Sequence, residues 1–285
     1  MINCSSQMAA SFDIQDIVKA RISLEHFRKY RVSRHHERYS FPFLLGTYFT
    51  YRKIDVLRLV SISKAISDDP KYVDVGCGYG DFLNKVRQFL GNAIGIEKDA
   101  RIFYNFNIQK PDFIRIADAR WQIEEEYDVI FVGWMDPRVD FTDAIAAKTN
   151  VVVTTLDQGI SRAAEFDAHG FKRIAYWRTP SWEDVNTEIM NRYYTKMSIH
   201  MRDFLFEMRG AHNLWYVYSK KPDISEVIRS ALLRRIEEER KIPQERYDFE
   251  DTLDECGFMY LQRLQNPCSA QAEKDLLWDV KFTDE

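Results

Sequence analysis

The sequence is poor in the features that mark several specialised classes of protein. Four cysteines occur among 285 residues and none forms a CxxC pair, so neither a metal site nor a disulfide framework is expected. No apolar run approaches the length of a membrane-spanning helix. The first residues have no basic start followed by an apolar stretch, so no secretory signal is expected. These absences predict a cytoplasmic protein with reduced thiols and no membrane span.

Strong net charge is also absent, because the formal net charge is only −4. This value excludes a strongly basic field over the whole chain but leaves room for a local basic patch. Residues 19–38 carry seven Lys and Arg side chains against two Glu. They form either a docking surface for phosphates or, in the simpler interpretation, the solvated face of a helix.

What the chain does have, after Lys71, is an alternation of short apolar runs with helical segments. Continuous apolar runs of this length are typical of strands that are buried on both faces of a mostly parallel sheet. Helices between such strands imply right-handed βαβ crossovers. The runs are 72–75, 93–96, 113–116, 127–132, 150–155, 171–177 and 213–219.

Helical patterns flank this core on both sides. Apolar residues at helical spacing predict a helix over 54–66, and a charged helix follows Lys221. In the second helix, the stretch RRIEEERK (234–241) is predicted to lie on the solvated side. We therefore expect three parts. They are a helical extension (1–69), a core (70–221, with an insertion at 178–212) and a second helical extension (222–285).

The sharpest local signal is a glycine-rich turn, VDVGCGYGDF, that leads from the first apolar run into a helix. Gly76, Gly78 and Gly80 permit positive φ and a close approach of backbone to ligand, at the sheet edge where ligands bind in α/β folds. The spacing is not the dinucleotide fingerprint G-x-G-x-x-G. Asp81 begins the helix, where it would serve as an N-cap and repel a pyrophosphate. The turn therefore favours a cationic ligand and argues against an NAD-dependent oxidoreductase.

Three carboxylates end or follow three consecutive runs. Asp74 precedes the first glycine, Glu97 ends the second run, and Asp118 follows the third. An acid after the second strand can accept both hydroxyls of a ribose. An acid after the third can accept a hydrogen bond from the exocyclic amine of adenine. Taken singly, each is better explained as a solvated carboxylate at a strand end, but the joint spacing predicts a pocket for an adenosine with a positively charged tail.

The segments VDVGCGYG (73–80), IGIEKD (94–99) and IADA (116–119) resemble the motifs of class I S-adenosylmethionine-dependent methyltransferases, and the resemblance covers about residues 70–220. It implies a three-layer Rossmann-like α/β fold with a seven-stranded, mostly parallel sheet whose last strand is antiparallel. It also implies S-adenosyl-L-methionine as cofactor, with methionine near the glycine turn, ribose at Glu97 and adenine at Asp118. The residues implied to bind the cofactor are Asp74, Gly76, Cys77, Gly78, Gly80, Glu97, Lys98, Asp118, Ala119 and Gly133.

The fourth run continues as YDVIFVGWMDP (127–137), in the place of the family's fourth motif but without the [DNS]-P-P-[YFW] of enzymes that methylate nucleic-acid amines. Asp136 is the candidate for orienting or deprotonating the acceptor, unless Asp136-Pro137 simply starts a turn. Candidates for the acceptor pocket, which core packing explains equally well, are Tyr51, Arg52, Trp134, Trp182 and Tyr194.

These residues predict an enzyme that methylates a small molecule. One alternative is an RNA or protein methyltransferase that docks its substrate on residues 19–38. The other is a module that binds S-adenosylmethionine without catalysis.

Overall fold

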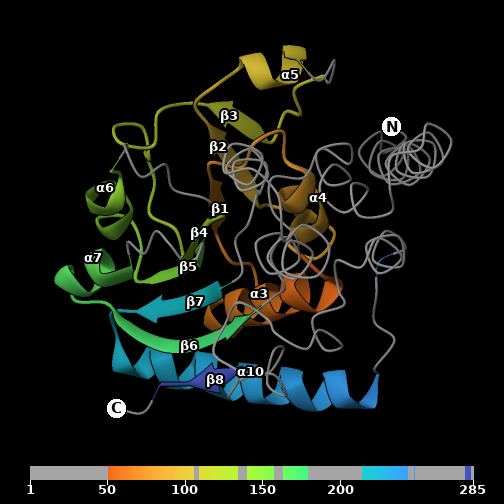
Figure 1. Cartoon of the computed structure of the whole chain (residues 1–285), viewed down its shortest axis with the longest axis vertical. Helices are drawn as coiled ribbons and strands as arrows, with labels where there is room; N and C mark the ends of the chain where they lie inside the picture. The colour runs from red at the N-terminus through yellow and green to blue at the C-terminus, as the bar shows by residue number, and fades with distance from the viewer. Residues whose placement is uncertain are drawn as a thin grey trace, which may run out of the picture. The chain divides into compact units, whose positions relative to one another are not determined.

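Two compact units make up the chain in the computed structural model. One comprises residues 1–52, 179–211 and 246–277, of which Tyr51, Arg52 and Tyr247 are described. The other comprises 53–178, 212–245 and 278–285 and contains the whole sheet (Figure 1). The residues that the structure describes are 51–105, 109–133, 140–156, 163–178, 214–242, 247 and 280–283.

The sheet has the strand order β3-β2-β1-β4-β5-β7-β6-β8. Strands β1 to β5 pair in parallel, and β7 lies antiparallel between β5 and β6. The predicted mostly parallel sheet with an antiparallel last strand is therefore confirmed. The strands are β1 (Tyr72–Val75), β2 (Ile94–Glu97), β3 (Ile114–Ile116), β4 (Val129–Val132), β5 (Val151–Leu156), β6 (Lys172–Arg178), β7 (Leu214–Ser219) and β8 (Lys281–Phe282).

The strand count differs from the prediction, because β8 adds an eighth strand antiparallel to β6. Its two residues lie in the run WDVKFT (278–283), where apolar and polar side chains alternate, and this strand pattern was overlooked in the sequence. The edge strand β6 thereby gains a partner over Ala175 and Tyr176.

Helices cover both faces of the sheet, as expected for a three-layer fold. Figure 1 shows α3, α4 and α10 on one side and α6 and α7 on the other. Alternate strand residues point to opposite faces, so Trp215 packs toward α4 while Tyr218 packs against Phe166 of α7. The helices are α3 (Lys53–Ile66), α4 (Asp81–Arg87), α5 (Arg101–Asn105), α6 (Thr142–Ala146), α7 (Ala163–Ala168) and α10 (Pro222–Lys241).

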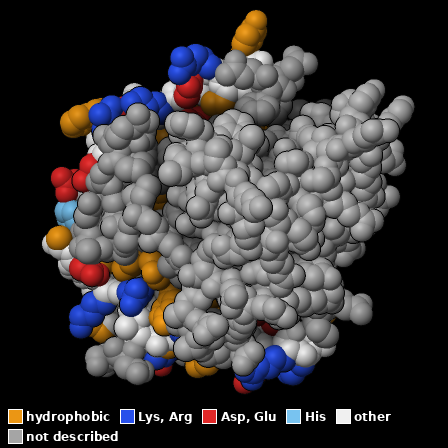
Figure 2. All heavy atoms as spheres, viewed as in Figure 1, with side chains coloured by type: hydrophobic (Ala, Val, Ile, Leu, Met, Phe, Trp, Pro, Cys, Tyr) orange, Lys and Arg blue, Asp and Glu red, His pale blue; other side chains and the backbone are white. Residues whose placement is uncertain are grey.

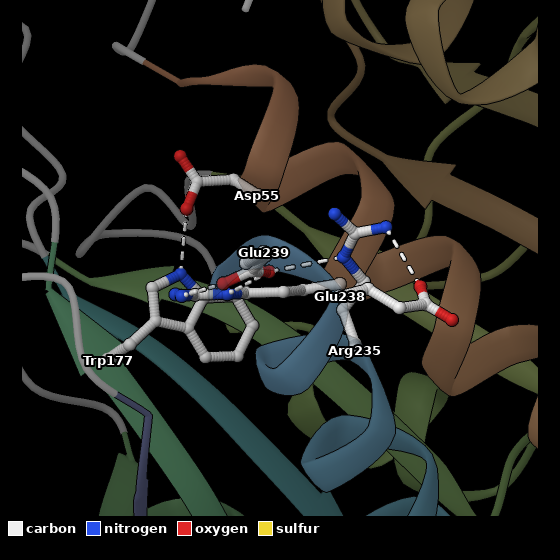
Figure 3. A network of polar contacts seen from close by, with 6 residues as sticks. Asp55, Trp177, Arg235, Glu238 and Glu239 are labelled. Atoms are coloured by element: carbon white, nitrogen blue, oxygen red, sulfur yellow. Dashed lines mark hydrogen bonds and ion pairs between the residues drawn. The ribbon is translucent and has the colours of Figure 1, made fainter. Parts of the chain in front are cut away.

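A largely buried ion pair joins Arg58 of α3 to Glu239 of α10, and Figure 3 shows Glu239 beside its second partner, Arg235. Nη2 of Arg58 lies 2.6 Å from Oε2 of Glu239, and the two side chains are 3% and 12% exposed. Arg235 is buried as well and contacts Glu239 from one turn earlier. The prediction that 234–241 lies on the solvated side was therefore wrong for Arg235 and Glu239. They face α3 because its Arg58 provides a charge partner, which the helical pattern of one segment does not reveal.

The sheet's unit includes α3 and α10 together with the strands. The three-part division at residues 69/70 and 221/222 stays a prediction. Among the helices that the structure describes, none is both long and apolar enough to cross a membrane.

Candidate functional site

The glycine turn follows β1 at the carboxyl edge of the parallel strands. Gly76, Gly78 and Gly80 all have positive φ, at 75°, 60° and 87°, a region that a side chain with a Cβ rarely adopts. The amide of Gly76 donates a hydrogen bond of 2.8 Å to the carbonyl of Ile96. The turn is therefore held against the end of β2, and its backbone path depends on the three glycines.

Helix α4 begins directly after the turn, but its N-cap is not the residue we expected. Gly80 occupies the N-cap position and forms no side-chain cap, whereas Asp81 is the first residue of the helix. The expectation that Asp81 serves as the N-cap was wrong, because the left-handed φ of Gly80 already turns the chain into the helix. Asp81 still places a negative charge in the first turn, where the helix dipole favours it.

A fourth glycine, Gly95 in β2, allows the turn to approach the sheet closely. A Cβ at position 95 would lie 2.5 Å from Sγ of Cys77 and 2.7 Å from Cδ2 of Leu83. Distances below 3.0 Å do not occur in real Cβ contacts, so this strand position accepts only glycine without movement. Sequence reasoning had not singled out Gly95, although a glycine inside an apolar strand is a known signal of close backbone approach.

Asp74, at the centre of β1, is a buried carboxylate without a fixed partner. Its side chain is 2% exposed. Its Oδ1 oxygen has no hydrogen-bond partner among the described residues. Burial raises the pKa of Asp74 well above its usual value, and the negative charges of Asp81 and Glu97 raise it further. Ionised Asp74 is therefore costly unless a cation or a hydrogen-bond donor lies against it.

Glu97, at the end of β2, connects the glycine turn to the loop that follows its own strand. Its Oε2 accepts a hydrogen bond of 2.9 Å from the amide of Gly78, and its Oε1 accepts one of 2.8 Å from the amide of Asp99. These bonds fix the orientation of the carboxylate. A carboxylate has about four acceptor positions, so each oxygen keeps one for a further donor.

Asp118, after β3, is held by two basic side chains. Arg120 donates from Nε to Oδ1 at 3.0 Å and from Nη2 to Oδ2 at 2.6 Å. Nζ of Lys98 lies 3.2 Å from Oδ2. The hydrogen bonds from Arg120, with a smaller contribution from Lys98, hold the pKa of Asp118 far below its usual range. Arg120 was not singled out from the sequence, because the loop after β3 determines that it meets Asp118.

The three acids come together because β3, β2 and β1 are neighbours in the sheet and end at one edge. Asp74 pairs with Gly95, and Glu97 pairs with Ile116, two residues before Asp118. Glu97 contributes to the raised pKa of Asp74, and Lys98 connects β2 to Asp118. The structure thus gathers the predicted cofactor residues on β1, β2 and β3 into one continuous edge.

The remaining predicted residues divide into described and undescribed ones. Ala119 and Gly133 are buried, and the carbonyl of Gly133 accepts a hydrogen bond from Oγ1 of Thr155. Tyr51 and Arg52 belong to the other compact unit. There, the ring of Tyr51 contacts that of Tyr247 edge-on, with 6.4 Å between centroids. Outside the described residues lie Trp134, Asp136, Trp182, Tyr194 and the basic segment 19–38.

The edge suits a cationic group better than an anionic one. The buried oxygen of Asp74 needs a donor, and Asp81 and Glu97 add negative charge around it. A pyrophosphate placed there would be repelled. Within the described ranges no group of three or more His, Cys, Asp or Glu side chains is arranged to hold a metal ion.

Comparison with known proteins gives structural matches only. No family model matches the chain, and no curated protein matches it in sequence. Among solved structures, the chain is similar to DesVI of Streptomyces venezuelae, with 14% identity, a TM-score of 0.31, and coverage of 36% of this chain and 50% of that one.

Two further matches are named as methyltransferases. A precorrin-6y C5,15-methyltransferase from Geobacter metallireducens has 17% identity and a TM-score of 0.33, covering 57% of this chain and 85% of that one. A tRNA (uracil-54, C5)-methyltransferase from Pyrococcus abyssi, in complex with S-adenosyl-L-homocysteine, has 13% identity and a TM-score of 0.35. The match covers 57% of this chain and 38% of that one. At this identity, the case for a function depends on the residues of this chain.

Proposed function

We propose that the chain is an S-adenosylmethionine-dependent methyltransferase that acts on a small molecule. One observation carries the proposal. Asp74 is a buried carboxylate with an unpartnered oxygen, next to a turn whose three glycines have positive φ. Such a carboxylate is costly to folding, so a protein that keeps it gains something from it. An ammonium group at this position would remove the cost.

Each residue of the edge has a proposed task. Asp74 accepts hydrogen bonds from the amino group of the methionine part, and the glycines let the backbone lie against it. Glu97 keeps one acceptor position per oxygen and uses both for the ribose hydroxyls. Asp118 accepts from the adenine amine by exchanging one of its present donors, because the amide and guanidinium of Arg120 and the ammonium of Lys98 already occupy its acceptor positions. When bound, S-adenosyl-L-methionine supplies a methyl group on a positively charged sulfur.

For methyl transfer the protein has to align the acceptor with the methyl group and keep water out. A general base is needed only if the acceptor carries a proton at the working pH. We propose Asp136 for orienting or deprotonating the acceptor. Tyr51, Arg52, Trp134, Trp182 and Tyr194 are the proposed walls of its pocket.

Two measurements test this proposal in order. Calorimetry on the full chain with S-adenosyl-L-homocysteine and S-adenosyl-L-methionine should give saturable binding, whereas NAD should give none. Methyl-labelled S-adenosyl-L-methionine, incubated with the protein and a cell extract, should then transfer label to the small-molecule fraction. Absence of binding to both adenosine ligands would contradict the proposal.

The same labelling experiment separates the alternatives. Label that appears in RNA or protein would retain the methyltransferase and replace the acceptor. In that case, reversing the charges of Arg28, Lys29 and Arg31 should reduce labelling if residues 19–38 dock the substrate. Tight binding with no transfer into any fraction would leave a cofactor-binding module without catalysis.

A further inference from the structure

A hollow with a volume of 700 Å³ opens at the edge of the sheet opposite the glycine turn. It is lined by the start of β6, the end of β7 and the start of α10. The strand register places it there. Ser219 pairs with both Val151 and Lys172, where β5 and β6 begin, whereas the turn follows the carboxyl end of β1. The hollow is therefore separate from the predicted cofactor edge.

The hollow is basic although the chain as a whole is slightly acidic. Its described lining includes five cationic side chains, namely Lys172, Arg173, Lys220, Lys221 and Arg229. Two acids, Asp167 and Glu226, also line it, and both are exposed. With five positive and two negative charges, these side chains have a net charge of +3, whereas the whole chain has a formal net charge of −4. Figure 2 shows Lys and Arg side chains together at the lower left, in the region where Figure 1 places the start of β6.

Arg173 is the most constrained of the five cations. Its guanidinium lies 5.1 Å from the ring centroid of Tyr176 and 5.0 Å from that of Tyr216. Two aromatic faces therefore fix its position. Its Nε is buried and has no hydrogen-bond partner among the described residues. Oγ1 of Thr283, which also lines the hollow, is likewise buried and unpartnered there. A buried donor of this kind is costly unless a ligand accepts from it.

The neighbouring cations divide into fixed and available groups. Lys220 donates to the carbonyl of Ala146 and lies 4.7 Å from the ring centroid of Phe171. Arg229 donates to the carbonyl of Thr283 at 3.0 Å. Lys172 and Lys221, by contrast, are exposed. Two mobile ammonium groups thus stand beside a fixed guanidinium, an arrangement that suits a ligand with several anionic oxygens.

The first turn of α10 contributes little to this field. The helix begins at Pro222, which has no amide N–H, and the amide of Ser225 already donates to the carbonyl of Lys221. The helix dipole places partial positive charge here, but the carboxylate of Asp223 in the same turn offsets it. Ser225, in this turn, also lines the hollow.

We propose that this hollow binds a diphosphate group, either free or as part of a nucleotide, as a second ligand site of the protein. Two linked phosphates carry about three negative charges at neutral pH, which matches the net charge of the lining. The volume lies in the range of small-molecule sites. The site does not depend on the proposed function, because it shares no residue with the glycine turn.

Calorimetry on the full chain tests this site, with pyrophosphate and adenosine diphosphate as probes. Both should bind, and each should displace the other. The double variant Lys172→Ala, Lys221→Ala should weaken pyrophosphate binding by about tenfold or more, because it removes two charge-assisted contacts. Lys64→Ala, an exposed lysine of α3 outside the hollow, is the matched control and should bind pyrophosphate as the wild type does.

The far-ultraviolet circular dichroism of each variant checks that it is folded. Lys172 and Lys221 are exposed, so their replacement should leave the fold intact. A second variant, Arg173→Lys, keeps the charge but loses the planar fork, and it too should weaken binding. Equal pyrophosphate affinity in all variants would overturn the proposal. The proposal would also be overturned if the wild-type protein bound a short oligouridylate but did not bind pyrophosphate. Affinity for S-adenosyl-L-homocysteine, measured on the same samples, should be the same in all variants. It reports separately on the edge of the sheet at the glycine turn.

Discussion

The amide of Gly78 and the carboxylate of Glu97 are joined by a hydrogen bond of 2.9 Å, although 19 residues separate them in the sequence. The bond ties the middle of the glycine turn to the end of the neighbouring strand. One residue thereby shapes the turn and, in the proposed function, holds the ribose. A change at Glu97 should consequently affect both stability and ligand affinity.

The first prediction concerns this bond. Glu97→Ala removes the acceptor of both Gly78 and Asp99, so the free energy of unfolding should fall by about 1 to 2 kcal/mol. Affinity for S-adenosyl-L-homocysteine should fall about tenfold or more. Glu97→Gln keeps one carbonyl acceptor and should lie between Ala and wild type. Calorimetry and urea unfolding measure the two effects.

Glu126→Gln, at an exposed position after β3, is the matched control for Glu97. It should leave both quantities unchanged. Wild-type affinity in Glu97→Ala would mean that Glu97 has only a structural task.

The second prediction concerns the space beneath the glycine turn. Gly95→Ala would place a Cβ 2.5 Å from Sγ of Cys77, and overpacking of this kind costs about 1 to 3 kcal/mol. Gly91→Ala meets no atom within 4 Å and serves as the control. In the double variant Gly95→Ala, Cys77→Ala, part of the lost stability should return. Urea unfolding of all three variants measures this, and equal midpoints for Gly95→Ala and Gly91→Ala would contradict the close packing.

The third prediction concerns the ion pair between α3 and α10. Glu239→Ala leaves the guanidinium of Arg58 buried without this carboxylate, and breaking a buried pair costs about 3 to 5 kcal/mol. The exposed pair Lys71–Glu125 has a separation of 3.5 Å, and Glu125→Ala should cost less than about 1 kcal/mol. Thermal unfolding of the two variants compares the pairs directly. A similar loss of stability in Glu239→Ala and Glu125→Ala would show that solvent reaches Arg58 freely.

The fourth prediction concerns pH. The pKa of Asp74 is raised by burial and by Asp81 and Glu97, so the folded protein keeps this proton to a higher pH than the unfolded chain does. Wild-type stability should therefore fall as the pH rises from the unfolded to the folded pKa. Asp74→Asn removes this loss and should be more stable at pH 7 by about 1 kcal/mol or more.

The same linkage fixes where the gain from Asp74→Asn disappears. Below about pH 3, Asp74 is protonated in both the folded and the unfolded state, and the two proteins should become equally stable. Urea midpoints of wild type and variant across this range test the sign. A variant that is less stable than wild type at pH 7 would contradict the buried-charge account of Asp74.

Much of the fold could be predicted because the parallel strands are short, apolar and buried on both faces. The runs at 72–75 and 213–219 became β1 and β7 almost residue for residue. The strand β8 was missed although apolar and polar side chains alternate over 278–283 (WDVKFT), and only its pairing with β6 is not given by the local pattern. The burial of Arg235 and the partial burial of Glu239 could not be predicted, because charged residues become interior only when a distant partner such as Arg58 meets them.

The candidate site, like the fold, could be predicted only in part. Strand-end acids could be placed on one edge from their spacing, because parallel neighbours end together. The partners of those acids could not be predicted, as the hydrogen bonds from Arg120 to Asp118 show. The spacing placed Asp81 at the start of this helix but did not indicate that Gly80 would be the N-cap.

In the proposed function, Asp74 is retained for a cationic adenosine ligand despite its cost to folding. This role is tested by titrating S-adenosyl-L-methionine into wild type, Asp74→Asn and the exposed control Asp112→Asn. We expect Asp74→Asn to bind about tenfold or more weakly and Asp112→Asn to bind as wild type does. Unchanged affinity in a folded Asp74→Asn variant, or no binding by the wild type, would contradict the claim.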